Sequence, residues 1–192
     1  VNLVVPAASI VCIEQSRRFS VIGIGCDDGR VIIHGVCTGV RVSTIKTTSK
    51  SENNSELVPI PTKILFTDNC GFVLVYTSNS SLVVSTLSGS ILKNIEKFNT
   101  IVSWFCFVPV KEQVDFVGFI GSKISGNEQK AFGNNYFLCC FEAAKPETVY
   151  CIAELPRNCE KFEVQFDKMR NAFIIASYRK DIMVIPMPDL NI

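Results

Sequence analysis

The stretch FSVIGIGCDDGRVIIHGV, residues Phe19–Val36, decides the fold. It holds two short runs rich in β-branched side chains, Phe19–Gly25 and Val31–Val36, on either side of Cys26-Asp-Asp-Gly29. Such runs favour strands, and Asp-Gly favours a tight hairpin turn because glycine readily adopts a positive φ. The stretch therefore predicts two antiparallel strands joined by a turn at Asp28-Gly29.

Two more hairpins of this kind follow along the chain, Gly71–Thr77 with Leu82–Leu87 and Ala172–Ser177 with Ile182–Ile185. Further strand-like runs lie before and after the hairpins, so the repeated unit is a set of four strands. The first runs of the four units are Ser9–Glu14, Lys63–Thr67, Thr100–Val108 and Glu160–Phe166, and the last runs of three of them are Val40–Ile45, Ser90–Ile95 and Thr148–Ala153. No stretch predicts a helix.

The four-stranded units recur at a spacing typical of propeller blades. The longer intervals between them contain two insertions, Thr47–Glu56 and Ser122–Asn134, of which the first is polar and is expected to be mobile. Without these insertions the period comes near the roughly 40–45 residues of a blade. The sequence thus predicts an all-β, WD40-like β-propeller of about four blades with four antiparallel strands each. The predicted blades span roughly 7–46, 57–97, 98–155 and 156–192.

The composition argues against several classes of function. The formal net charge is +1, so the chain as a whole does not attract nucleic acid, and no apolar run approaches the roughly 18 residues of a membrane span. Nine cysteines occur without a Cys-x-x-Cys pair, and His34 is the only histidine, so neither a metal site nor a cofactor is predicted. Most cysteines lie in strand-like runs, which favours reduced thiols and a cytoplasmic location.

An alternative hypothesis is that the chain is an extracellular β-sandwich or lectin-like binding domain. In that case the two sequons that begin at Asn53 and Asn79 would be glycosylation acceptors, and some of the cysteines would form disulfides.

The segment DGRVIIHGVCTGVRVSTI, residues Asp28–Ile45, resembles a blade of the C-terminal WD-repeat propeller of BEACH-domain proteins, the beige and neurobeachin family. That blade reads Asp, two variable residues, Val-Ile-Ile-His, a Gly five residues after the His, and then Arg-Thr-Leu. The present chain departs from it at Ser43 and Ile45. The residues that match are Asp28, Val31, Ile32, Ile33, His34, Gly39 and Thr44.

The resemblance implies a scaffold that binds other proteins in vesicle or lysosome-related membrane trafficking. It also implies a cytoplasmic protein that associates peripherally with endomembranes through the rest of its chain. The chain lacks the Trp-Asp and Gly-His pairs of standard WD repeats, and its single tryptophan, Trp104, lies in a strand-like run. The hydrogen-bonded network of a standard WD repeat is therefore expected to be absent or degenerate.

The family resemblance further implies a ring of about seven blades. The fourth predicted blade has no outer strand, because Pro186 and Pro188 follow its third strand and proline donates no ladder hydrogen bond. The apolar segment Val1–Val5 would pair with Ile182–Ile185 in a closed four-bladed ring, whereas in a larger ring it would belong to a preceding blade. We expect the larger ring, of which this chain is an arc.

No catalytic residue is predicted. His34 lies in the middle of a strand-like run and is interpreted as a structural residue, and Cys139 and Cys140 should point to opposite faces of a strand. The protein is instead expected to contact its partners through the turns between the first and second strands, which a propeller gathers on one rim. The basic residues of these turns are Arg17, Arg18, Lys111, Lys168 and Arg170, with Glu14, Glu112, Asp115 and Asp167 beside them.

Overall fold

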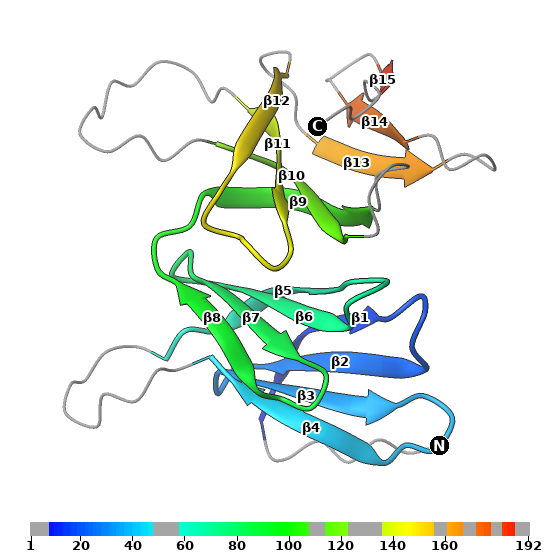
Figure 1. Ribbon diagram of the computed structural model, residues 1–192, viewed down its shortest axis with the longest axis vertical. Helices are drawn as coiled ribbons and strands as arrows, with labels where there is room; N and C mark the ends of the chain where they lie inside the picture. Colours follow the sequence, from blue (N-terminus) through cyan, green and yellow to red (C-terminus); the bar gives the residue numbers. More distant parts are fainter. Residues whose placement is uncertain are drawn as a thin grey trace. The chain divides into compact units, whose positions relative to one another are not determined.

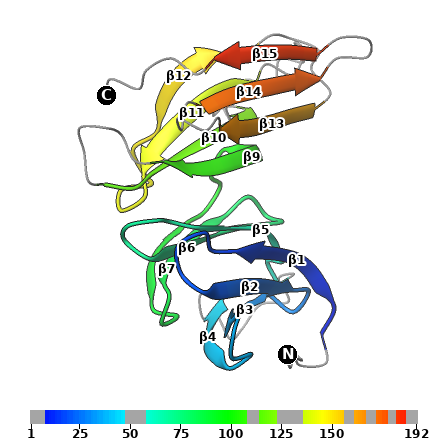
Figure 2. The same cartoon turned by 90° about the vertical axis from the view of Figure 1, so that its right-hand side faces the viewer.

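A computed structural model describes residues 8–47, 58–107, 114–122, 136–155, 161–166, 172–177 and 182–186. All the regular elements within these ranges are β-strands, arranged in antiparallel sheets (Figures 1 and 2), which confirms the predicted all-β class. The chain divides into two compact units, Val1–Phe98 and Asn99–Ile192.

The first unit consists of two four-stranded sheets in which each strand pairs with the next one along the chain. This order follows from the short turns, because neighbouring antiparallel strands need only a few linking residues. The first sheet contains β1 (Ile10–Gln15), β2 (Val21–Cys26), β3 (Arg30–Gly35) and β4 (Arg41–Lys46). The second contains β5 (Pro61–Phe66), β6 (Phe72–Thr77), β7 (Leu82–Thr86) and β8 (Ile91–Ile95).

The second unit repeats this arrangement with one complete sheet and a three-stranded one. The complete sheet contains β9 (Thr100–Phe107), β10 (Phe116–Ser122), β11 (Phe137–Glu142) and β12 (Tyr150–Glu154). The three-stranded sheet contains β13 (Lys161–Phe166), β14 (Ala172–Ser177) and β15 (Ile182–Pro186). Val1–Val5, expected to belong to a preceding blade, lies outside the described residues.

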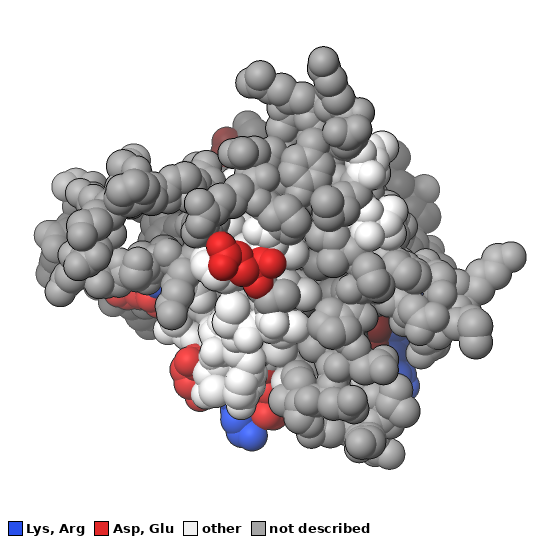
Figure 3. All heavy atoms as spheres, turned by 90° about the horizontal axis from the view of Figure 1, so that it is seen from above, with Lys and Arg blue, Asp and Glu red and all other residues white. Residues whose placement is uncertain are grey.

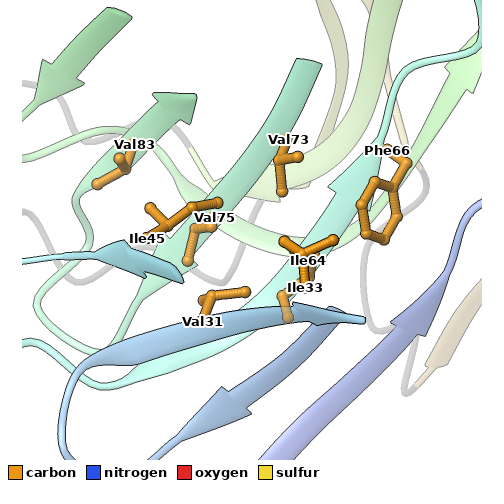
Figure 4. Close-up of a cluster of buried hydrophobic side chains, with 8 residues drawn as sticks. All are labelled: Val31, Ile33, Ile45, Ile64, Phe66, Val73, Val75 and Val83. Carbon is orange, nitrogen blue, oxygen red and sulfur yellow. The ribbon is translucent and has the colours of Figure 1, made fainter. Parts of the chain in front are cut away.

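The core of the first unit lies between its two sheets. Alternate residues of a strand face opposite sides of a sheet, so the apolar runs of β3 and β6 supply side chains to both faces. Each such buried aliphatic or aromatic side chain contributes about 1.5–3 kcal/mol relative to an exposed one. The buried cluster consists of Val31, Ile33 and Ile45 from the first sheet and Ile64, Phe66, Val73, Val75 and Val83 from the second (Figure 4).

The first strands of neighbouring sheets pack closely against one another, β1 beside β5 in the first unit and β9 beside β13 in the second. In each complete sheet the chain then proceeds outward from this strand to the fourth one. Sequential sheets that are each built from consecutive strands and meet along their first strands are the arrangement of propeller blades, whereas in a β-sandwich Greek-key connections link strands of the two sheets. The β-sandwich alternative is therefore not supported.

The predicted insertion Thr47–Glu56 begins one residue too early. Thr47 is buried, and its Oγ1 lies 2.8 Å from the carbonyl oxygen of Gly29 and 2.6 Å from that of Pro59. The hydroxyl has one proton and donates to one of these oxygens at a time. Thr47 therefore anchors the connection between the first two sheets, and residues 48–56 of the insertion lie outside the described residues.

Candidate protein-contact rim and the His34 turn

His34 lies in β3 and is almost completely buried, with 1% of its surface exposed. Its Nδ1 is 3.0 Å from the carbonyl oxygen of Gly39. A carbonyl oxygen only accepts hydrogen bonds, so Nδ1 carries the proton and donates it. This bond closes the turn between β3 and β4, together with the bond from the Gly35 N–H to the Val40 carbonyl oxygen.

The spacing between His34 and Gly39 follows from the geometry of this turn. Gly39 has a φ of 68°, in the left-handed region that favours glycine, and its N–H donates to the Gly35 carbonyl oxygen over 2.8 Å. A glycine five residues after the histidine thus turns the chain so that its carbonyl faces the ring. The other ring nitrogen of His34, Nε2, is buried and has no hydrogen-bond partner among the residues that the structure describes.

The turn between β2 and β3 has the predicted hairpin geometry. Gly29 has a φ of 79°, and its N–H donates to the carbonyl oxygen of Cys26 over 3.2 Å. The Asp28 carboxylate accepts bonds from the backbone N–H of Arg30 over 3.2 Å and from its Nε over 2.6 Å. These bonds, of which the one from the side chain has the larger effect, hold the pKa of Asp28 below its ordinary value.

The aliphatic residues of the family motif have separate packing roles. Val31 and Ile33 face the second sheet and belong to the core in Figure 4. Ile32 faces the other way and packs with Ile24 and Cys26. Thr44 lies opposite Ile32 on β4 and is half-buried. The motif residues therefore build the blade and its turns.

The structure brings together two turns on the rim of the first unit. Arg17 and Arg18 are exposed in the turn between β1 and β2, where the Arg18 Nη1 donates to the Asn69 Oδ1 over 2.8 Å. Asn69 lies in the corresponding turn between β5 and β6. A Cβ placed on Gly71 in that turn would lie 3.5 Å from the Phe19 ring, so these two turns also meet through apolar contact.

The electrostatics of this rim are mixed. Glu14 lies near Arg17 at the end of β1, where desolvation raises the pKa of its carboxyl group and Arg17 partly offsets the increase. Asp68 lies beside Asn69 in the second turn. On the face shown in Figure 3, the described acidic and basic residues also form small separate groups. Neither the rim nor the face in Figure 3 has a large patch of one sign among the described residues.

Of the other residues predicted at this rim, the structure describes only Asp115. Lys111, Lys168 and Arg170 lie outside the described residues, as do Glu112 and Asp167. Asp115, expected beside the basic residues, is completely buried just before β10, and the Cys106 Sγ lies 3.9 Å from its Oδ1. It is therefore not a solvated rim charge. The sequence did not predict Asn69 and Phe19 as rim residues, because their contacts join two neighbouring blades.

The described residues contain no group of three or more His, Cys, Asp or Glu side chains placed to hold a metal ion. All eight described cysteines are thiols, and Cys159 lies outside the described residues. No helix long and apolar enough to cross a membrane occurs in the part of the chain that the structure describes.

Comparison with known proteins identifies the fold. No protein-family model and no curated protein sequence matches the chain. Among solved structures, the WD40 domain of Toxoplasma gondii coronin has a TM-score of 0.55 at 11% identity, with 94% of this chain and 47% of that one covered. The Dos1 propeller has a TM-score of 0.55 at 12% identity, with 94% and 45% covered.

The computationally designed Ika4 protein is similar over nearly its whole length. It has a TM-score of 0.53 at 12% identity, and the similarity covers 97% of this chain and 96% of that one. The chain thus spans less than half of the two WD-type chains and nearly all of the designed one. Its fold is that of WD40-like β-propellers.

Proposed function

We propose that this chain is a non-catalytic scaffold that binds other proteins through the rim formed by its first-to-second strand turns. The observation that carries the proposal is the contact between two such turns, in which Arg18 of one blade bonds to Asn69 of the next. This contact makes a continuous surface from separate blades, and Arg17 and Cys70 are exposed on it. Binding residues commonly lie on loops that a rigid scaffold holds in place.

The chemistry of the rim fits a protein partner better than a nucleic acid. Exposed arginines favour protein interfaces because the guanidinium both stacks and donates several hydrogen bonds. A net charge of +1 and the nearby acidic residues Glu14 and Asp68 give little of the field that phosphate binding needs. The propeller fold also places separate turns side by side, which suits an extended protein surface.

We further propose that the chain is an arc of a seven-bladed propeller in a BEACH-type protein. This protein would act in vesicle or lysosome-related trafficking, in the cytoplasm and peripherally on endomembranes. The support is the resemblance of Asp28–Ile45 to the family blade, together with the bond that links its two characteristic residues, His34 and Gly39. The coding sequence upstream of Val1 tests this proposal, because it should encode a BEACH domain. An unrelated upstream domain would reject the family assignment and leave the rim proposal standing.

Charge reversal tests the rim. The variant R17E/R18E/K111E should lose at least tenfold in affinity for a partner first captured by the wild-type chain and then purified. Its melting temperature should stay nearly unchanged, because Arg17 and Arg18 are exposed and exposed charges contribute little to stability. The matched control is R41E/K46E/K97E, which reverses three exposed basic residues away from these turns and should bind normally. Equal binding by all three proteins would move the contact to another surface.

A further inference from the structure

Two cysteines lie directly opposite one another on neighbouring strands of the third sheet. Cys139 in β11 is the register partner of Cys151 in β12. Residues in register on antiparallel strands point to the same face of the sheet. The pair continues a row across that face, because Cys139 is also opposite Phe119 in β10, which is in turn opposite Trp104 in β9.

The distances in such a pair suit a disulfide. Opposite residues in antiparallel sheets have Cα atoms about 4.5–5.5 Å apart. Disulfides are found where the Cα separation is about 4.4–6.8 Å. A register shift between Leu138 and Cys139 also gives this part of the β11–β12 ladder an extra residue, which provides local freedom to adjust.

The two thiols differ in their access to solvent, and a third thiol provides the contrast. Cys151 is exposed on the outer strand, and Cys139 is half-buried beside it. Cys140 is next to Cys139 in the chain but faces the other side of the sheet, where it is completely buried. Burial raises the pKa of Cys140 to about 11, so this third thiol is poorly reactive.

We propose that Cys139 and Cys151 form a reversible disulfide by exchange with a small-molecule disulfide. The thiolate of the exposed Cys151 attacks one sulfur of the reagent, forms a mixed disulfide and releases the first thiol. The thiolate of Cys139 then attacks the Cys151 sulfur, which releases the second thiol. Two protein thiols are oxidised, the reagent disulfide is reduced to two thiols, and the two protons end on these products.

The product links the outer strand of the sheet covalently to its neighbour. In a reducing compartment the pair stays as thiols, and an exposed cross-strand disulfide is easily reduced again. The chain therefore carries a site that responds to the balance between thiols and disulfides, and neither of its cysteines belongs to the turns proposed as the protein-contact rim.

Oxidised glutathione is a direct probe of this site. In a folded chain that carries Cys37→Ser and Cys70→Ser, which remove the other two exposed thiols, the reagent should consume two titratable thiols, and the chain should remain monomeric on a non-reducing gel. Cleavage after Glu142 and Glu147 separates the two strands, and mass spectrometry should find the Cys139 and Cys151 peptides joined. Dithiothreitol should restore both thiols.

Matched variants identify the sulfurs that take part. Cys140→Ser should form the link as the wild-type chain does, whereas Cys151→Ser, which changes an exposed side chain, should not. In urea the preference for this pair over the other cysteines should disappear, because the register of the sheet is lost. A link that involves Cys140, a stable glutathione adduct on Cys151 alone, or only intermolecular disulfides would overturn the proposal.

Discussion

His34 combines almost complete burial with a hydrogen bond at only one of its ring nitrogens. The bonded nitrogen, Nδ1, donates its proton to the Gly39 carbonyl oxygen. Nε2, by contrast, is desolvated without a hydrogen-bond partner among the described residues. The contribution of His34 to stability is therefore the bond at Nδ1 and the packing of the ring.

The variant His34→Phe separates these two contributions. Phenylalanine keeps a planar ring and removes both the donor to Gly39 and the unpartnered Nε2, so the free energy of unfolding should fall by no more than about 1 kcal/mol. Urea-induced unfolding measures this change. Arg41→Gln, which alters the exposed residue opposite His34, should change the stability by less than about 0.5 kcal/mol. A His34→Phe chain more stable than the wild type would show that the buried Nε2 costs more than the bond at Nδ1 contributes.

Cys140 makes the stability depend on pH in the alkaline range. Its pKa is raised from 9.0 to about 11 by burial, so the folded chain keeps the thiol neutral where the unfolded chain ionises it. The stabilisation is therefore complete below pH 9 and is lost as the pH rises toward 11, by about 2–3 kcal/mol in all. Urea unfolding at pH 8 and pH 10.5 should show a steeper loss for the wild type than for Cys140→Ser. Parallel losses in the two chains would contradict this origin.

Single residues show which parts of the site could be predicted from the sequence. The motif residues His34 and Gly39 could be found by their spacing, although the hydrogen bond that explains the spacing becomes visible only with the turn folded. Arg17 and Arg18 could be assigned to an exposed turn by local sequence. The contact of Arg18 with Asn69 and that of Phe19 with Gly71 join blades about 50 residues apart, and no local pattern specifies such pairs.

The pairing of β9 with β10 depends on a glycine beneath an aromatic ring. Gly118 is opposite Phe105 in the register, and a Cβ at this position would overlap the Phe105 ring. Both residues are buried, so neither the ring nor the strand has free space into which it can move. The close approach of ring and backbone stabilises the strand pair in place of a side chain on Gly118.

Gly118→Ala should therefore destabilise the chain by about 1–3 kcal/mol through overpacking. Phe105→Leu alone should also destabilise it, because it opens a cavity. In the double variant the smaller side chain makes room for the added methyl group, so the loss should be smaller than the sum of the two single losses. Thermal or urea unfolding of the four chains completes the cycle, and strict additivity would show that the ring is not the obstacle.

The strands themselves could be predicted because their physical causes are local. Phe19–Gly25 and Val31–Val36 correspond to β2 and β3 within about two residues at their ends, and Asp28-Gly29 forms the turn. Thr47 could not be assigned from its polar neighbours. Its burial depends on the carbonyl oxygens of Gly29 and Pro59, which meet it only after the first two sheets have formed.

At the scale of the whole molecule, the first sheet has an apolar face directed away from the second. Ile10 and Ile13 are the register partners of Cys26 and Ile24 and therefore share their face. They are 49% and 55% exposed, although both are large aliphatic residues on a first strand. In the larger ring that we propose, a preceding blade would cover these two side chains.

The isolated chain should therefore self-associate through this face. The variant I10K/I13K should weaken the association more than about tenfold, because it removes two side chains that contribute about 1.5–3 kcal/mol each when buried. Sedimentation at several concentrations measures the effect. Leu92→Lys is the control, since Leu92 is 49% exposed but lies on the outer strand β8. A monomeric wild-type chain would show that this face needs no partner.

The order in which strands pair also has a consequence for synthesis on the ribosome. Each complete sheet forms from consecutive strands, so the first sheet can assemble while the rest of the chain is still being made. The inner face of that sheet, with Val31, Ile33 and Ile45, stays uncovered until Val83 has emerged, roughly 40 residues after Ile45. At about 5–20 residues per second this interval lasts roughly 2–8 s. During it the nascent chain presents three aliphatic side chains to chaperones, and slower translation between Lys46 and Val83 would lengthen that exposure.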